Sequence, residues 1–204
     1  MKVLLILFGY LMGGIPTGKI VVKKAKGIDI QSRGSGNIGA ANVYRVAGTS
    51  ASTIVLLADT FKGLLPVLIA KKATDSSLVH ALVGIAVVIG HIWPALRGFK
   101  GGKGVVTNLG ALLALAPTPG LIAAVTGGSM MAKFRISSLG SLSGTAVGAF
   151  CLLVAVLFGK KPTAYLLQAL IPTAIIFYAH RENIDRLLAG AENRLEFDPG
   201  EEEG

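Results

Sequence analysis

Long apolar runs dominate the chain, and polar residues are confined to the short stretches between them. A helix that crosses the hydrocarbon core of a bilayer needs about 20 residues, and most of these runs approach that length. The pattern therefore predicts an all-α fold, a polytopic integral membrane helical bundle of about seven transmembrane segments. The runs lie at about residues 3–22, 52–70, 78–96, 105–116, 120–132, 142–159 and 163–179.

The fourth and fifth runs are short, and only Pro117, Thr118 and Pro119 separate them. Two short tilted helices would fit these runs, and so would a single re-entrant pair. In the second case five full spans and the re-entrant pair would replace seven crossings, and both chain ends would keep their sides of the membrane. The sequence leaves these two alternatives open.

Composition supports a membrane protein, and the basic residues indicate its orientation. Only 15% of the residues are charged and the formal net charge is +9, whereas a soluble domain usually carries about 25% charged residues. With the N-terminus outside, 14 of the 20 Lys and Arg residues fall on the inner side and 5 on the outer side, and Lys62 lies within a span. Because Lys and Arg accumulate on the cytoplasmic side, we predict an N-out, C-in topology.

The loops between the runs are too short to form a soluble core of their own, so residues 1–204 are expected to form a single transmembrane domain. Acidic residues gather in a C-terminal tail, residues 195–204, which is expected to be a solvated, mobile end. The net positive charge lies at the ends of apolar runs, which favours anionic ligands and membrane lipid as partners and not nucleic acid.

Cysteine and histidine usage argues against a disulfide or a metal site. Cys151 is the single cysteine, so no intrachain disulfide can form. His80 and His91 are separated by eleven positions, with no carboxylate or thiolate at ligand spacing, so we predict no metal. His91 and Trp93 fit the belt of amphipathic side chains at a membrane interface.

The first candidate motif is a glycine-rich stretch over residues 34–45 that contains Gly-x-Gly-x-x-Gly. No strand precedes it, so a dinucleotide-binding fold is rejected. Glycines still allow backbone N–H groups to approach an anion. Ser35 and Asn37 add side-chain donors, and Arg45 adds a bidentate group for phosphate. The alternative is a flexible glycine turn with a solvated arginine.

The second motif, residues 98–107, places glycines and two lysines directly before an apolar helix. The N-terminus of a helix carries free N–H groups and a partial positive charge. Together with Lys100 and Lys103 it would form an anion site. The alternative is a basic cytoplasmic anchor with a glycine hinge.

The third motif runs from His180 to Glu192, where the last apolar run ends. If the helix continues, His180, Asn183 and Leu187 share one face. His180 is then a candidate general base near neutral pH, and Asn183 would orient it or bind a phosphate oxygen. The alternative is an interfacial histidine followed by a basic helix end.

Two smaller polar features accompany these motifs. The hydroxyls of residues 137–141 would either donate to a phosphate or cap the next helix. Asp59 and Lys62 lie three residues apart inside the second apolar run. Charges at that depth usually face the bundle interior and are paired, so a structural ion pair is predicted.

In this order the motifs resemble the bacterial acyl-phosphate:glycerol-3-phosphate acyltransferases, the PlsY family. Ala41 departs from the threonine that is usual in that family. The resemblance implies transfer of a fatty acyl chain from acyl phosphate to the sn-1 hydroxyl of glycerol 3-phosphate, which yields lysophosphatidic acid and phosphate without a cofactor. The matching stretches cover nearly the whole chain and are residues 15–18, 34–45, 58–63, 90–94, 98–107, 138–141 and 180–192.

The resemblance also implies a location and partners. The enzyme is expected to be a multi-pass protein of the bacterial cytoplasmic (inner) membrane with its active site facing the cytoplasm. The expected partners are acyl phosphate, glycerol 3-phosphate, membrane lipid and, transiently, the enzyme that produces the acyl phosphate. The runner-up function is an organic-anion transporter or channel, and the third is a scaffold subunit of a lipid-synthesis complex.

Residue roles follow from the motifs and the resemblance. Lys103, Arg45 and His180 are predicted to be catalytic, and Asp59, Lys62 and Glu192 to be structural. Because an acyl phosphate is already activated, positioning and charge stabilisation suffice, and an acyl-enzyme on Ser35 is less favoured. The proton acceptor stays open between His180 and a substrate phosphate. The predicted substrate-binding residues are Ser35, Gly36, Asn37, Asn42, Gly101, Gly102, Gly104, Thr107, Ser138, Ser141 and Asn183.

Overall fold

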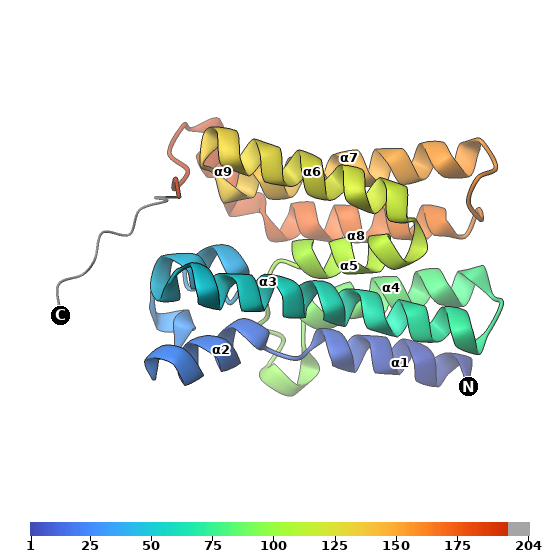
Figure 1. Cartoon of the computed structure of the whole chain (residues 1–204), viewed down its shortest axis with the longest axis horizontal. Coiled ribbons are helices and arrows are strands. Elements are labelled where there is room, and N and C mark those ends of the chain that lie inside the picture. The colour runs from blue at the N-terminus through green and yellow to red at the C-terminus, as the bar shows by residue number, and fades with distance from the viewer. Residues whose placement is uncertain (196–204) are drawn as a thin grey trace.

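The computed structural model describes residues 1–195, which form a bundle of roughly antiparallel helices (Figure 1). The described chain contains no strand, so the all-α prediction is confirmed. The predicted acidic tail lies outside the described residues, except for its first residue, Leu195. The helices are α1 (Lys2–Gly13), α2 (Thr17–Lys26), α3 (Ala40–Ala73), α4 (Ser77–Ile92), α5 (Val105–Leu115), α6 (Pro117–Phe134), α7 (Ser137–Leu157), α8 (Tyr165–Ala179) and α9 (Arg181–Leu188), with 3-10 turns at Ile30–Ser32 and Ala95–Arg97.

Helices α1, α3, α4, α5, α6, α7 and α8 run alternately up and down the bundle (Figure 1). Helix α1 begins at one end, whereas α2, the start of α3 and α9 gather at the other end. Within residues 1–195, four helical stretches are long and apolar enough to cross a membrane, and two shorter apolar helices, α5 and α8, accompany them. Helix α5 has 11 residues, which is roughly 16 Å or about half of a hydrocarbon core.

The first apolar run, residues 3–22, forms part of a candidate span over Lys2–Lys26, and this span is interrupted between two helices. The chain leaves the helix after Gly13 and enters α2 at Thr17. Pro16 explains the interruption, because proline has no N–H group and its ring clashes with the preceding turn of a helix. The break releases backbone carbonyls inside the bundle, and these carbonyls need new hydrogen-bond donors.

The predicted ion pair between Asp59 and Lys62 is present at this break. The Lys62 ammonium lies 2.7 Å from Asp59, and each side chain is only 4% exposed. Lys62 also donates to the Ile15 carbonyl at 2.9 Å, and the Thr17 hydroxyl donates to Asp59. A buried ion pair needs such additional hydrogen bonds to offset its desolvation. The pair therefore joins α3 to the junction between α1 and α2.

Helices α3 and α7 begin at least five residues before the apolar runs that predicted them. Helix α3 starts at Ala40, so Arg45 lies on a short helical segment before a kink at Gly48 (φ 76°, ψ −175°). This left-handed conformation favours glycine. Helix α7 starts at Ser137, and its first turns carry serines and glycines because they face the interior of the bundle and not lipid.

Small residues allow the central helices to approach closely. The α-carbon of Gly63 in α3 lies against the Thr107 carbonyl of α5, and a β-carbon there would overlap it. Gly110 of α5 meets the Thr60 carbonyl of α3 in the same way. These contacts place the start of α5 next to α3, at the level where the site is formed.

Candidate active site

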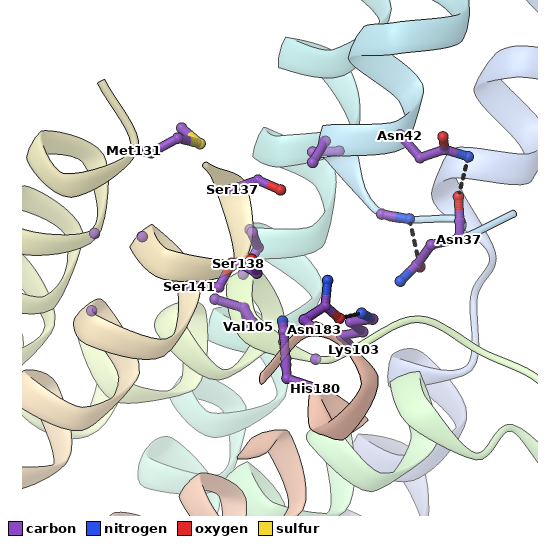
Figure 2. Close-up of a pocket in the computed structure, with 18 of the residues that line it drawn as sticks. Asn37, Asn42, Lys103, Val105, Met131, Ser137, Ser138, Ser141, His180 and Asn183 are labelled. Carbon is purple, nitrogen blue, oxygen red and sulfur yellow. Dashed lines mark hydrogen bonds between the residues drawn. The ribbon is translucent and has the colours of Figure 1, made fainter. Parts of the chain in front are cut away.

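One cavity of about 580 Å³ lies among α3, α5, α6, α7 and α9 (Figure 2). It brings together residues from all of the predicted motifs. Gly36, Gly101, Gly102, Thr107 and Lys62 lie outside its lining in the described chain. The predicted residues that do line it are Ser35, Asn37, Asn42, Arg45, Asp59, Lys103, Gly104, Ser138, Ser141, His180, Asn183 and Glu192.

Asn42 holds the first glycine-rich loop in shape. Its side-chain oxygen accepts the Ser35 N–H group at 2.8 Å, and its amide nitrogen donates to the carbonyls of Arg33 (3.1 Å) and Asn37 (2.8 Å). Asn42 is 1% exposed, so its polar atoms serve the loop. Arg45 lines the cavity one helical turn later, and its guanidinium donates no hydrogen bond within residues 1–195, which leaves this group available to an anion.

The second loop places Lys103 at the N-terminus of α5. The chain turns through left-handed conformations at Gly98 and Gly104 and enters the helix at Val105. Gly104 and Val105 line the cavity, so the free N–H groups of this helix end lie beside it. Lys103 donates a hydrogen bond to the side-chain oxygen of Asn183 (Figure 2). Burial lowers the pKa of the Lys103 ammonium, and the Glu192 carboxylate opposes this effect.

The last apolar helix does not continue through the third motif, so the condition for the shared face of His180, Asn183 and Leu187 is not met. Helix α8 ends at Ala179, His180 leaves the helical conformation (φ −103°, ψ 7°), and α9 begins at Arg181. The turn directs His180 and Asn183 to the cavity, whereas Leu187 is not part of its lining within the described chain. The cavity therefore receives His180 and Asn183 from this motif.

His180 is held as a neutral imidazole. Its Nδ1 atom lies 2.8 Å from the Ile176 carbonyl, so Nδ1 carries the proton and Nε2 can accept a hydrogen bond. The pKa of His180 is lowered to about 4, chiefly by burial and also by the nearby Lys103 charge, although the Ile176 carbonyl and the Glu192 carboxylate oppose this effect. At neutral pH the group is therefore an uncharged hydrogen-bond acceptor.

Glu192 connects the segment that follows α9 to helices α7 and α9. Its carboxylate accepts hydrogen bonds from Ser138 (3.1 Å), Asn183 (2.6 Å) and Arg186 (2.8 Å). Burial raises the pKa of Glu192, but these three donors outweigh burial and leave the pKa below its usual value. Asn183 thus contacts both Glu192 and Lys103. No side chain caps the start of α7, so the alternative of a capping role for the serines is wrong.

Sequence reasoning missed several buried polar residues around the cavity. His91 was assigned to the membrane interface, yet it is 6% exposed and lines the cavity. Asn108 also lines it, and Gln168 of α8 donates to Asn108 at 2.9 Å inside the bundle. An amide in the middle of an apolar run was the available signal, because buried polar groups in a membrane need a partner.

The other wall of the cavity is apolar. Leu109 and Leu112 of α5, Ala123 of α6 and Gly144 of α7 line it, and Leu56 lines it from α3. This wall continues directly from the polar residues around Lys103. The cavity can therefore hold a molecule with an anionic head and a hydrocarbon tail.

Comparison with known proteins identifies the family. The family model described as "Glycerol-3-phosphate acyltransferase" matches residues 3–190. The chain belongs to the glycerol-3-phosphate acyltransferase family. A family member from Rubrobacter xylanophilus is 41% identical over 195 residues, with 96% of each chain covered. Another from Geobacter metallireducens is 45% identical over 194 residues, covering 95% of this chain and 97% of the relative.

Two solved structures of PlsY, described as an integral membrane glycerol 3-phosphate acyltransferase, share the fold. Its glycerol 3-phosphate form and its lysophosphatidic acid form superpose with TM-scores of 0.88 and 0.87. Each is 39% identical to this chain and covers 96% of both chains. The resemblance inferred from the motifs is confirmed, and this family member is an integral membrane acyltransferase. The transporter and scaffold alternatives gain no support from these matches.

Proposed function

We propose that the protein transfers a fatty acyl chain from acyl phosphate to the sn-1 hydroxyl of glycerol 3-phosphate. The products are lysophosphatidic acid and inorganic phosphate, in the first step of phospholipid synthesis. The observation that carries this proposal is the meeting of Arg45, Lys103 and His180 in one cavity that also has an apolar wall. Both substrates carry phosphate and one carries a hydrocarbon chain, so this combination suits them.

The phosphate-binding roles rest on donors that surround the polar end of the cavity. Arg45 and Lys103 would bind the two phosphates and stabilise the oxyanion that develops on the acyl carbonyl. The side chains of Ser35 and Asn37, which line the cavity, would surround one phosphate. The N-terminus of α5 adds its free N–H groups. Asn183 would keep Lys103 in position through the hydrogen bond between them.

The proton is best accepted by the leaving phosphate. The sn-1 hydroxyl oxygen attacks the acyl carbonyl carbon, the bond from that carbon to the phosphate oxygen breaks, and the proton of the hydroxyl moves to the departing phosphate. Even a phosphate monoester has a second pKa near 6, and the inorganic phosphate released here is a stronger base, whereas the pKa of His180 is lowered to about 4. His180 is the weaker base, so its Nε2 atom would orient the hydroxyl by accepting a hydrogen bond.

The acyl chain would lie along the apolar wall between α3, α5, α6 and α7. We further place the protein in the bacterial cytoplasmic membrane with the polar end of the cavity facing the cytoplasm. The support is the excess of Lys and Arg on that side, where both anionic substrates are available. A transient contact with the enzyme that produces acyl phosphate would deliver the donor to this basic face.

The test is a reconstituted reaction. Purified protein in liposomes is incubated with palmitoyl phosphate and radiolabelled glycerol 3-phosphate, and lysophosphatidic acid and phosphate are measured. We expect equimolar products, no reaction with palmitoyl-CoA, and at least a hundredfold loss of kcat/KM in Arg45→Leu and Lys103→Met. Lys24→Met, which changes an exposed lysine of α2, serves as the control. Product formed from palmitoyl-CoA alone, or no product from either donor, would contradict the proposal.

A further inference from the structure

His91, in the last turn of α4, contacts the second glycine-rich loop, residues 98–107, through its backbone and its side chain. Its backbone carbonyl belongs to the end of the helix, where carbonyls lack partners within the helix. This carbonyl accepts the Gly102 N–H group at 3.1 Å. The α-carbon of Gly101 lies against the same carbonyl, and a β-carbon there would overlap it. The end of α4 and this loop are therefore in direct backbone contact.

The imidazole of His91 contacts the chain on both sides of Lys103. Its Nε2 atom lies against Gly102, where an added β-carbon would overlap the ring. Its Nδ1 atom lies 3.1 Å from the hydroxyl of Thr107, in the first turn of α5. One buried side chain thus contacts the residue before Lys103 and the residue four positions after it.

The hydrogen bond to Thr107 fixes the orientation of the ring. Thr107 is fully buried, and its hydroxyl has no other side-chain hydrogen bond within residues 1–195. A buried hydroxyl that donated to nothing would be costly, so Thr107 donates and His91 Nδ1 accepts. An asparagine at position 91 would keep an acceptor near the Nδ1 position, whereas a leucine would remove it.

We propose that His91 is a positioning residue for Lys103. By holding Gly102 on one side and Thr107 on the other, the imidazole fixes the turn from which the Lys103 side chain reaches Asn183 and the cavity. This inference rests on the proposed role of Lys103 in phosphate binding. It predicts that a substitution at His91 weakens anion binding because it displaces Lys103, and not because it lowers the general stability of the bundle.

The test compares His91→Leu, His91→Asn and Thr107→Val with the wild-type protein. Steady-state kinetics with palmitoyl phosphate and glycerol 3-phosphate are combined with equilibrium binding of inorganic phosphate and with melting temperatures in detergent. We expect His91→Leu and Thr107→Val to raise the Kd for phosphate at least fivefold and to lower kcat/KM at least tenfold. His91→Asn is expected to stay within threefold of the wild type.

A double-mutant cycle provides the readout that a purely structural residue would not give. If His91 affects phosphate binding only by positioning Lys103, its replacement has no further effect once Lys103 is gone. The variants Lys103→Met and His91→Leu/Lys103→Met should therefore bind inorganic phosphate with the same Kd. The matched control is His80→Leu, a buried histidine that contacts Thr74 and Tyr165 instead. It is expected to lower the melting temperature without changing KM.

Two results would overturn the inference. One is a His91→Leu variant whose Kd for phosphate and kcat/KM both stay within twofold of the wild type. The other is an effect of His91→Leu on the Kd that adds fully to that of Lys103→Met. Both are meaningful only if the wild type makes lysophosphatidic acid, so the wild-type assay separates a failure of this inference from a failure of the proposed function.

Discussion

At the scale of single residues, the site depends on polar side chains that hold one another. Lys103 contacts Asn183, Asn183 donates to Glu192, and Glu192 also accepts from Ser138 and Arg186. The Glu192 side chain is only 5% exposed, and such a buried network is favourable only when each member keeps its partner. The residues that touch the substrates therefore depend on neighbours that do not.

Replacement of Glu192 by glutamine should disturb this network although the shape is preserved. The amide nitrogen would face either the Arg186 donor or the donors of Asn183 and Ser138, so at least one donor would lose its acceptor. An unsatisfied buried donor costs about 1–3 kcal/mol. We expect Glu192→Gln to lower the melting temperature in detergent by several degrees. Glu182→Gln, at an exposed glutamate, should change it little, and equal shifts for both variants would contradict the argument.

His180 should make the protein sensitive to moderate acid. The pKa of His180 is lowered from 6.5 to about 4 in the folded state. Above pH 6.5 the histidine is neutral in both states and has no effect. Between pH 6.5 and 4 only the unfolded state takes up the proton, so stability falls with pH by about 3 kcal/mol in total.

The measurement is the melting temperature of the ligand-free protein in detergent from pH 7.5 to 4.5. The melting temperature of His180→Asn should decrease less steeply than that of the wild type as the pH falls over this window. Glu192, whose pKa is also lowered, contributes stability that is present above about pH 4.5 and is lost at lower pH. A wild type and a His180→Asn variant with parallel curves would exclude His180 as the cause.

At the scale of elements, the site exists because several helices are short, broken or kinked. Helix α5 begins inside the bundle, α8 ends at His180, and α3 kinks at Gly48. The carbonyls at the far end of α5 are also satisfied, since Lys71 donates to Ala114 (2.9 Å) and Lys161 donates to Leu115 (3.2 Å). Lysines suit this end because it carries the negative pole of the helix.

The close crossing of α3 and α5 should not tolerate a larger residue. A β-carbon at Gly63 would overlap the Thr107 carbonyl, and overpacking typically costs about 1–3 kcal/mol. We expect Gly63→Ala to lower both the melting temperature and the activity, because α5 carries the second loop at its N-terminus. The control is Gly128→Ala in α6, where nothing lies within 4 Å of an added β-carbon.

In the control, alanine should raise helix stability by up to about 1 kcal/mol, since glycine is a poor helix former. Thermal melting and lysophosphatidate synthesis are measured on both variants in the same detergent. A Gly63→Ala variant as stable and as active as Gly128→Ala would show that the α3–α5 contact can relax.

At the scale of the whole molecule, the site lies toward the end of the bundle where α2, the start of α3 and α9 gather (Figure 1). The start of α1 and the connection between α7 and α8 lie at the opposite end. The distribution of Lys and Arg predicts that the site end faces the cytoplasm. The polar end of the cavity would then be open to water-soluble substrates from the cytoplasm. Its apolar wall would extend into the hydrocarbon core of the membrane.

This topology can be tested with single cysteines in a Cys151→Ser background. Lys26→Cys lies at the end of α2 and Lys160→Cys follows α7, and both positions are exposed. A membrane-impermeant maleimide should label position 160 in intact cells and position 26 only after the membrane is opened. Labelling of position 26 in intact cells would reverse the proposed orientation.

The membrane class, most of the helices and the motifs follow from the sequence alone. Apolar runs determine helices in a bilayer because every backbone polar group there must be satisfied within the segment. Glycine next to lysine or arginine at the ends of such runs already indicated anion binding, as in residues 34–45 and 98–107. Even the Asp59–Lys62 pair followed from local spacing, since residues three apart share a helix face.

Only the tertiary structure decided which atoms serve the loops and which remain free for a substrate. Asn42 and Arg45 belong to one motif, yet Asn42 is committed to its own loop and Arg45 is not. His91 contacts Gly102 and Thr107, on either side of Lys103 in the chain, because the end of α4 packs against the start of α5. Such assignments depend on contacts between residues far apart in the chain, and local periodicity carries no information about those contacts.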